Sequence, residues 1–171
     1  DTMQPPCRQL IVWEPESRLI LGGYRFIIGE DIRMDANGRP RIATSHMFDF
    51  SDKFIRDYLP QTLELGRSFV RLEYQSSRAG AKALYALDNL WDGLGALTVV
   101  YPQIRYLFGK VTMYPSYSCE CRNMILYFMN KYFPDPDHLV RPRNPLDTHI
   151  DTEAMQRLFT GADFKADYRI L

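Results

Sequence analysis

The sequence of 171 residues predicts an α/β protein built on a mixed β-sheet flanked by helices. Two β-rich runs near the N-terminus, separated by a short polar turn, predict a hairpin and therefore an antiparallel pair of strands. Farther along, a strand, a long amphipathic helix and a second strand follow one another. This order predicts a parallel pair joined by a right-handed crossover. Because there is no internal repeat or linker, we expect one domain over residues 1–171.

The first half of the chain supplies the hairpin and a short helix. The hairpin strands are residues 10–13 and 19–28, with residues 14–17 as the turn, and residues 35–40 form a loop around Asn37-Gly38. Asp49 or Ser51 is suited to cap a helix over residues 52–59, which Pro60 would end. Because the chain starts almost directly in a strand, with nothing before it to cover that side of the sheet, we expect an N-terminal element to be absent.

The second half begins with a strand at residues 62–73. A small-residue loop at 76–82 leads into a helix that Pro102 ends, and its apolar side chains recur at helical spacing: Leu84, Leu87, Trp91, Leu94 and Leu97. A strand interrupted by Gly109 is expected at 106–113, and a helix from Pro115 or Ser116 to about Tyr132. A proline-punctuated loop covers residues 133–145, and the last twenty residues indicate a short helix and an irregular tail.

Charge and cysteine content exclude several classes of protein. Lys and Arg total 21, as do Asp and Glu, so the net charge is zero, which argues against a dedicated nucleic-acid binder. No apolar run approaches the roughly 20 residues of a membrane span, and no signal-peptide pattern opens the chain. The three cysteines are too few for a disulfide scaffold, so we expect a cytoplasmic protein. Cys119 and Cys121 lack a second ligand pair, and we expect no metal site.

The strand at residues 62–73 contains charges where packing residues are expected. Glu64, Gly66 and Arg67 interrupt an apolar run, and strict alternation would point Glu64 and Arg67 to opposite faces. A bulge at Gly66 would bring the two charged groups toward one site. Glu64 is then suited to act as a general base, directly or through one water, because burial would raise its pKa. The alternative is a Glu64–Arg67 ion pair that only holds the strand.

Three groups of residues together resemble one protein family. They are Glu64-Leu-Gly-Arg-Ser-Phe-Val70, Leu90-Trp-Asp-Gly93 and Tyr106-Leu-Phe-Gly109. In addition, Gly22-Gly-Tyr-Arg25 resembles the hairpin segment of the same family. Over residues 8 to 145 the chain resembles the GNAT acyltransferase superfamily. The resemblance is to the branch that contains hemolysin-like proteins and the N-acyltransferases of ornithine and glycine lipids. Acyl-homoserine-lactone synthases are more distantly similar.

The resemblance implies a splayed sheet that binds a thioester donor. The pantetheine arm would lie between the strands at 62–73 and 106–113, and backbone N–H groups of Ser68, Phe69 and Val70 would polarise the thioester carbonyl. The phosphate would bind the loop before the long helix. We expect donor contacts from Arg71, Arg78, Ala79, Gly80 and Ala81. Ala81 stands where the family pattern has its first glycine, which favours a carrier-protein donor over coenzyme A.

The remaining candidate residues surround this strand. Arg67 orients Glu64 or binds the carboxylate of the acceptor, since its planar fork suits bidentate contact. Arg25 faces the same cleft and binds the acceptor, or is a surface arginine. Tyr114, with Ser116 and Tyr117 as neighbours, is the candidate acid for the leaving thiolate. Arg71, Arg78 and Lys82 form a basic rim for an acidic carrier protein, or are simply solvated. Trp91 is expected in the core, with ligand stacking as the alternative.

The resulting hypothesis is an N-acyltransferase that moves a fatty acyl group from acyl carrier protein to the amine of an amino acid. In its more specific form, the acyl group is 3-hydroxylated. The product would be an aminolipid precursor. Direct transfer is expected because no activated nucleophile is evident, and no tightly bound cofactor is expected. The alternatives are an acyl-homoserine-lactone synthase, an acetyl-CoA-dependent N-acetyltransferase, and a hemolysin-like membrane-acting protein. We expect a cytoplasmic location, with peripheral contact at the inner membrane surface as a further possibility.

Overall fold

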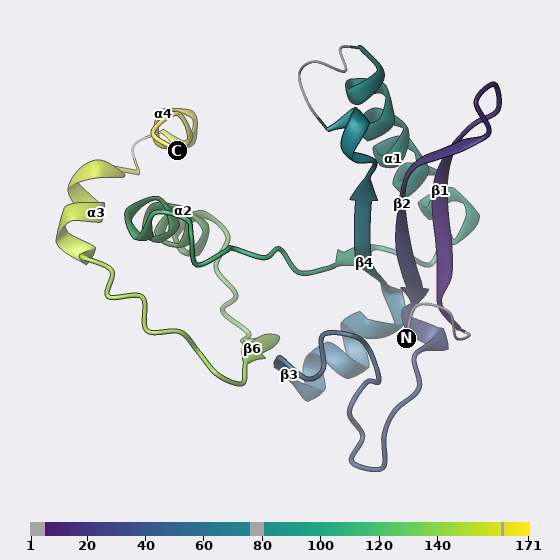
Figure 1. The fold of residues 1–171 in the computed structure, drawn as a ribbon. Helices are drawn as coiled ribbons and strands as arrows, with labels where there is room; N and C mark the ends of the chain where they lie inside the picture. The colour runs from purple at the N-terminus through teal and green to yellow at the C-terminus, as the bar shows by residue number, and fades with distance from the viewer. Residues whose placement is uncertain (1–5, 76–80, 162) are drawn as a thin grey trace. The chain divides into compact units, whose positions relative to one another are not determined.

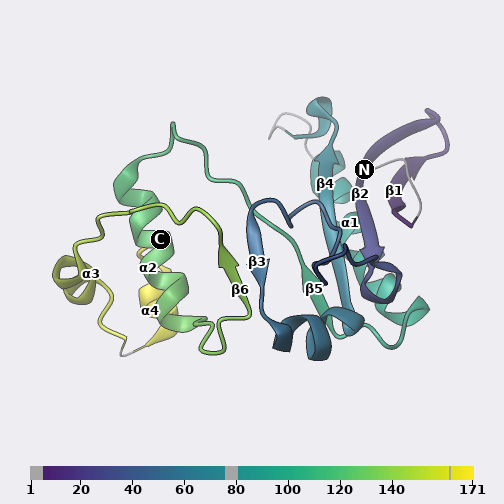
Figure 2. The ribbon, with the colours of Figure 1, turned by 90° about the horizontal axis from the view of Figure 1, so that it is seen from below.

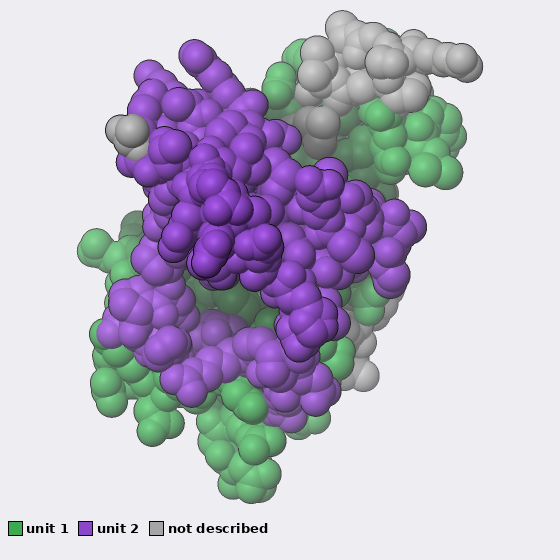
Figure 3. Space-filling view, turned by 90° about the vertical axis from the view of Figure 1, so that its left-hand side faces the viewer, with its two compact units in different colours: residues 1–110 green, residues 111–171 purple. Residues whose placement is uncertain are grey.

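The computed structural model describes residues 6–75, 81–161 and 163–171. The chain divides into two compact units, residues 1–110 and residues 111–171, which Figure 3 distinguishes by colour. Each unit is described separately below. The expectation of a single acyltransferase domain over residues 1–171 remains a prediction.

A four-stranded mixed sheet forms the centre of the first unit. Its strand order is β1-β2-β4-β5, with the bounds β1 Arg8–Glu14, β2 Leu19–Ile28, β4 Thr62–Val70 and β5 Tyr106–Phe108. The pairs β1–β2 and β2–β4 are antiparallel, and β4–β5 is parallel. Figure 1 shows β1, β2 and β4 side by side, and Figure 2 shows β5 next to β4. The predicted hairpin, the parallel pair and the mixed sheet are all confirmed.

Short helical turns connect the strands, and one long helix follows β4. The elements are η1 Gly29–Asp31, β3 Phe48–Phe50, η2 Phe54–Tyr58, η3 Leu59–Gln61, η4 Leu72–Tyr74 and α1 Ala81–Val100. The helix predicted over residues 52–59 is present, but it contains the π-helical turn η2 and runs on into the 3-10 turn η3. Pro60 lies in the first turn of η3 instead of ending the helix. Proline is tolerated there because the N–H groups of the first turn have no acceptor within the helix. The strand expected to reach Glu73 ends at Val70.

Helix α1 covers one face of the sheet. Six buried side chains from the sheet, the helix and the following turn make this core: Phe26, Ile28, Leu63, Leu94, Leu97 and Ile104. The expectation that Trp91 packs in the core is wrong, because its side chain is 66% exposed. The buried stripe instead passes through Ala86 and Leu90. Trp91 follows Leu90 by one residue, about 100° around the helix, and therefore leaves the stripe.

Strands β4 and β5 stay together for only three residue pairs. Pairing runs from Thr62–Tyr106 to Glu64–Phe108, and β5 ends there although the sequence predicted a strand up to residue 113. β4 continues to Val70 without β5 beside it. Gly109 marks the point of departure, where an added Cβ would lie 3.3 Å from the carbonyl oxygen of Leu65. The two strands thus separate beyond Glu64, as the predicted splay requires.

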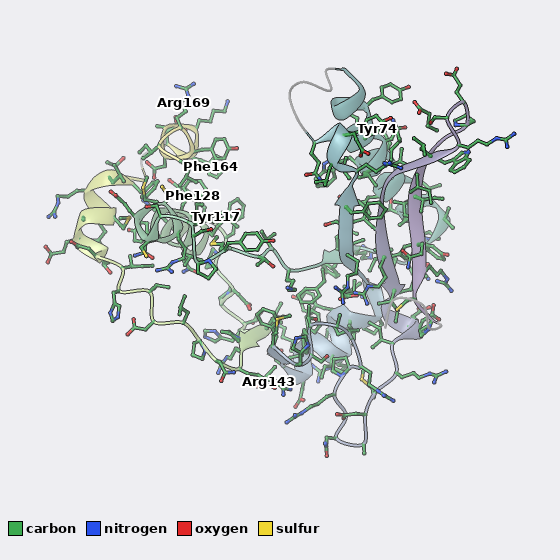
Figure 4. The ribbon with its side chains drawn as sticks, viewed as in Figure 1. Tyr74, Tyr117, Phe128, Arg143, Phe164 and Arg169 are labelled. Carbon is green, nitrogen blue, oxygen red and sulfur yellow. The ribbon has the colours of Figure 1, made fainter. Side chains whose placement is uncertain are left out.

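The second unit packs around aromatic side chains. Its elements are α2 Cys119–Tyr132, β6 Val140–Pro142, α3 Thr152–Leu158 and α4 Phe164–Tyr168. Phe128 and Phe159 are buried, and Figure 4 shows Phe128 beside Phe164, with ring centroids 5.6 Å apart. α2 starts about three residues later than predicted, because the Ser118 side chain accepts from the Cys121 N–H and caps it there. α4 occupies part of the tail that was expected to be irregular.

No helix in the described ranges is both long and apolar enough to cross a bilayer.

Candidate active site

Two opposite charges are buried together on the face of the sheet away from α1. Arg25 lies on β2 and Glu64 on β4, and Arg25 Nη2 donates to Glu64 Oε2 at 2.6 Å. Their side chains are only 2% and 1% exposed. Arg25 is opposite Gly66 and Ile27 is opposite Glu64, so the ion pair runs diagonally between the two strands.

Gly66 makes this diagonal contact possible. A Cβ added to Gly66 would lie 2.6 Å from Arg25 Nη2 and 3.2 Å from Arg25 Nε. The guanidinium therefore occupies the space that a side chain at this position would need. We expected Gly66 to host a bulge, and its observed role is instead to let Arg25 reach Glu64.

The bulge that the sequence predicted in β4 is present one residue later. Gly23 is opposite Phe69 and Arg25 is opposite Gly66, so the single residue Tyr24 faces both Arg67 and Ser68. Arg67 has a φ of 51°, in the left-handed region that bulges of this kind usually fill with glycine. That conformation costs a residue with a side chain about 1–2 kcal/mol. Arg67 is exposed, and the ion pair of Glu64 is with Arg25 and not with Arg67.

The electrostatics of Glu64 are dominated by its removal from water. Burial raises the pKa of Glu64 above its usual value, and the charge and hydrogen bond of Arg25 act in the opposite direction. The guanidinium itself has few partners: Nη1 contacts Cys7 Sγ at 3.9 Å, and within the described residues Nε has no hydrogen-bond acceptor. Glu64 is therefore a carboxyl group that keeps its proton to a higher pH than an exposed one does.

Aromatic side chains contribute to the apolar surroundings. Phe108 is the register partner of Glu64 across β4 and β5, so both side chains project from the same face of the sheet. The ring of Phe108 lies 5.8 Å from that of Phe50 and 5.7 Å from that of Phe54, measured between centroids. This cluster places low-dielectric material on the face that carries Glu64.

The edge of β4 that β5 leaves carries outward-pointing backbone groups. The N–H of Arg71 donates to the carbonyl oxygen of Leu21 on β2 at 2.8 Å. Because alternate residues of a paired strand point to opposite edges, the N–H and C=O of Val70 point away from β2. The carbonyl oxygen of Val70 accordingly accepts from the side chain of Gln75. The backbone at Val70 thus faces the side where the thioester was predicted to bind.

The structure brings together only part of the predicted site. Arg25 and Glu64 are in contact, while Arg67, Ser68, Phe69, Val70 and Arg71 follow along the same strand and just beyond it. Arg71 pairs with Glu73 at 3.1 Å. Arg78, Ala79 and Gly80 lie outside the described residues, and Ala81 is the first residue of α1. Tyr114 belongs to the second unit, with its ring 5.9 Å from that of Tyr117. The roles assigned to these residues remain predictions.

Sequence reasoning missed the partnership of Arg25 with Glu64 and the contact with Cys7. A signal for the first was present, since Arg25 is the single charged residue in the apolar run Leu19–Ile28. A buried guanidinium needs an acceptor, and Glu64 is the one carboxylate in the neighbouring apolar strand. For Cys7 no comparable signal exists. Among the described residues no three His, Cys, Asp or Glu side chains are grouped as a metal site would require.

Comparison with known proteins assigns the fold to a family. Residues 1–85 match the family described as "Acetyltransferase (GNAT) domain". The chain belongs to the GNAT superfamily. The parting of β4 from β5 beside a bulge is thus the splay of a GNAT sheet, and the Arg25–Glu64 pair lies where that splay begins.

Two curated relatives match the whole chain. One is named glycine N(alpha)-acyltransferase from Bacteroides thetaiotaomicron, 62% identical over 171 residues, and the chain covers 51% of it. The other carries the same name, comes from Phocaeicola vulgatus and is 57% identical over 171 residues, with 52% of it covered. The chain therefore spans about half the length of the curated relatives it matches. No solved structure matches the chain significantly.

Proposed function

We propose that the protein is an N-acyltransferase that transfers a fatty acyl group from a thioester donor directly to the amine of glycine. The observation that carries the proposal is Glu64, a buried carboxyl group on the bulged strand at the point where β5 leaves it. The names of the two relatives, which match over all 171 residues, support glycine as the acceptor.

In the proposed reaction Glu64 is the general base. A neutral glycine amine attacks the thioester carbonyl, the new C–N bond forms, and the C–S bond breaks. Glu64 takes the proton from the amine, directly or through one water, and a base whose pKa is raised by burial suits this task. Arg25 holds the carboxylate in place through the 2.6 Å contact. Backbone N–H groups of the Ser68–Val70 segment stabilise the oxyanion, and Tyr114 returns a proton to the leaving thiolate.

The donor in this proposal is acyl carrier protein, and its acyl group is a 3-hydroxy fatty acid. A carrier protein presents a single phosphodiester, which suits the loop sequence around Arg78 better than the pyrophosphate of coenzyme A does. Carrier proteins are acidic, and Arg71 and the basic residues that follow it in the sequence would attract one. The product, an N-acyl amino acid, would be a precursor of an aminolipid. Release of such a product fits peripheral contact with the inner surface of a membrane.

The decisive experiment incubates the full-length protein with acyl carrier protein thioesters and a panel of amino acids, and identifies the products by mass spectrometry. The proposal expects N-acylglycine as the main product and a strong preference for the carrier-protein donor over acyl-CoA. A lactone product would instead identify an acyl-homoserine-lactone synthase. Efficient use of acetyl-CoA without response to the carrier protein would identify a small-substrate acetyltransferase. Acylation of neither glycine nor any other amine would overturn the proposal.

A further inference from the structure

Residues 33–41 form a short two-stranded ribbon whose outer face carries three arginines. Met34 and Pro40 form an antiparallel bridge, and the Arg41 N–H donates to the carbonyl oxygen of Arg33 at 2.8 Å. Residues directly opposite each other in such a ribbon point to one face, and successive residues alternate between faces. Met34 and Pro40 therefore share a face, on which Pro40 is buried. The other face carries four exposed side chains: Arg33, Asp35, Arg39 and Arg41.

Asp35 is committed to the turn at the tip of the ribbon. Its Oδ1 accepts from the Arg39 N–H at 2.9 Å and from the Asn37 N–H at 2.8 Å. The bond from Arg39 comes first among the causes that hold the pKa of Asp35 below its usual value, and the charges of Arg39 and Arg41 contribute as well. The carboxylate thus fixes the backbone of the ribbon and leaves the face positively charged.

The arginines lack the counter-ions that their positions call for. Arg33 is directly opposite Arg41, and like charges in this relation destabilise a pair of strands. In the part of the chain that the structure describes, none of the three guanidinium groups lies within ion-pairing distance of a carboxylate. Residues 32–48 contain three arginines and one acid, a net charge of +2 in a chain whose net charge is zero. An anion from outside the chain would supply the counter-charge.

The ribbon lies far from the expected position of the donor. Figure 1 shows the segment between η1 and β3 projecting beyond the start of β4, whereas η4 and the start of α1 lie at the other end of that strand. The phosphate of the donor, and with it the carrier protein, is expected at the α1 end. The anion that the ribbon binds therefore belongs to a different partner. Several guanidinium groups on one exposed face suit the phosphate headgroups of a bilayer, which form an extended anionic surface.

We propose that the outer face of the ribbon, formed by Arg33, Arg39 and Arg41, docks the protein on the anionic headgroups of a bilayer. The inference rests on the proposed function for its purpose alone, since an N-acylglycine with a long chain is an amphiphile that a bilayer can take up directly. The docking itself depends on the charges of the ribbon and can be measured without any acyl transfer.

The test measures co-sedimentation of the full-length protein with phosphatidylcholine vesicles that contain or lack phosphatidylglycerol. We expect the wild-type protein to bind the mixed vesicles, and the binding to weaken as salt is added. The triple variant Arg33→Gln, Arg39→Gln, Arg41→Gln should bind the mixed vesicles about a hundredfold more weakly, because it loses three cations near the anionic surface. Its Tm should not fall, since the three guanidinium groups repel one another.

Asp35→Asn tests the same surface in the opposite direction. Asparagine keeps a side-chain oxygen for the Arg39 and Asn37 N–H groups but removes the one negative charge on the outer face. The ribbon should therefore keep its shape and bind the mixed vesicles about fivefold more tightly than the wild-type protein does.

A second triple variant is the matched control. Arg18 is in the turn between β1 and β2, Arg141 is in β6 and Arg169 follows α4, and all three are exposed. Changing these three to glutamine alters the net charge as much as the ribbon variant does, without touching the ribbon. We expect this control to bind the mixed vesicles within about twofold of the wild-type protein.

Several results would overturn the inference. A wild-type protein that does not bind the mixed vesicles, or binds pure phosphatidylcholine equally well, would do so. Equal losses in the ribbon variant and the control would show an effect of net charge alone. A ribbon variant with unchanged vesicle binding and a higher KM for acyl carrier protein would assign the arginines to the carrier. A protein that binds the mixed vesicles through the ribbon but acylates no glycine would refute the proposed function and leave this inference intact.

Discussion

Among the residues that the structure describes, each unit buries one carboxylate, and the surroundings of the two groups differ. Glu64 in the first unit is 1% exposed and Asp167 in the second is 2% exposed. Asp167 Oδ2 accepts from Tyr132 Oη at 2.6 Å, from the Gly161 N–H at 2.9 Å and from Lys131 Nζ at 3.3 Å. Within the described residues, the side-chain partner of Glu64 is Arg25, whose Nε has no hydrogen-bond acceptor there.

The difference in donors produces opposite pKa shifts. The hydrogen bond from Tyr132 comes first among the causes that lower the pKa of Asp167, and in turn the carboxylate raises the pKa of Tyr132 to about 12. Burial raises the pKa of Glu64 despite Arg25. A carboxylate with three donors stays charged and fixes structure, whereas one with fewer donors can exchange a proton. Asp167 is therefore a structural carboxylate, and Glu64 is the candidate base.

The largest expected effect comes from neutralising each carboxylate in turn. Glu64→Gln keeps the size of the side chain and an oxygen for Arg25 but removes the base, so kcat should fall by about a hundredfold to ten-thousandfold. Its Tm should fall as well, because the buried Arg25 guanidinium loses its charged partner. Asp167→Asn should lower the Tm and leave kcat of the folded protein unchanged, because the Lys131 ammonium loses its ion-pair partner. Steady-state kinetics and thermal unfolding of both variants measure this. Loss of kcat in Asp167→Asn but not in Glu64→Gln would reverse the assignment.

The next effect concerns the space over Gly66. In Gly66→Ala the new Cβ would collide with the Arg25 guanidinium, so the free energy of unfolding should fall by about 1–3 kcal/mol and kcat should fall with it. Gly95→Ala is the control, because Gly95 is in α1 and nothing lies within 4 Å of its added Cβ. That change should raise the free energy of unfolding by about 0.5–1 kcal/mol. Denaturant unfolding of the two variants tests the contrast, and equal stabilities would contradict it.

A change of pH is expected to have a smaller effect on stability, and its sign differs between Glu64 and Asp167. The folded-state pKa of Glu64 lies above its unfolded value, so kcat/KM should fall as the pH drops through it, and its ionisation slightly destabilises the fold as the pH rises. The folded-state pKa of Asp167 lies below its unfolded value. Its stabilisation is therefore complete above the unfolded pKa and is lost as the pH falls through the folded one.

The pH experiment records kcat/KM and Tm over the same pH range for the wild-type protein and the two carboxylate variants. Glu64→Gln should lose the acidic limb of the rate profile and keep the acidic fall in Tm. Asp167→Asn should show the converse. A rate profile of Glu64→Gln with an unaltered acidic limb would assign that limb to another group.

The smallest effect is expected from Tyr132→Phe, which removes a single donor from Asp167. Lys131 and the Gly161 N–H remain, so we expect the Tm to fall by roughly a few degrees, with no change in kcat. Differential scanning calorimetry measures the shift. A Tm fall as large as that of Asp167→Asn would show that Tyr132 alone holds the carboxylate.

Much of the fold followed from local sequence patterns. The hairpin, the strand carrying Glu64 and the long helix α1 were predicted, because alternation, helical spacing and turn residues are properties of neighbouring positions. Trp91 was misplaced because two stripes, one through Leu90 and one through Trp91, are nearly equivalent on a helix with apolar residues on several sides. The length of β5 was overestimated because strand propensity does not report where a partner strand diverges.

The site was predicted less completely, because it depends on the register between strands that are far apart in the sequence. Glu64 was identified as the candidate base from its position in an apolar strand. Its partner was not, because Arg25 is 39 residues away and the pairing depends on how β2 aligns with β4. The bulge was expected at Gly66 because glycine favours the left-handed conformation, yet the conformation falls on Arg67. Glycine is needed at position 66 because the Arg25 guanidinium, from a distant part of the chain, occupies the space beside it.

The bulge also changes how the sequence of β4 must be counted. Before the bulge, Glu64 and Gly66 lie on the same face of the sheet as Arg25, so the even-numbered residues of β4 point to that face. After the bulge, Phe69 is opposite Gly23 and its ring lies on this same face, so the odd-numbered residues point there. The extra residue thus shifts the strand's phase by one position. A deletion of Arg67 or Ser68 would restore simple alternation and leave Phe69 on the face of Arg25, whereas a strand that kept both residues without the bulge would send Phe69 to the face covered by α1.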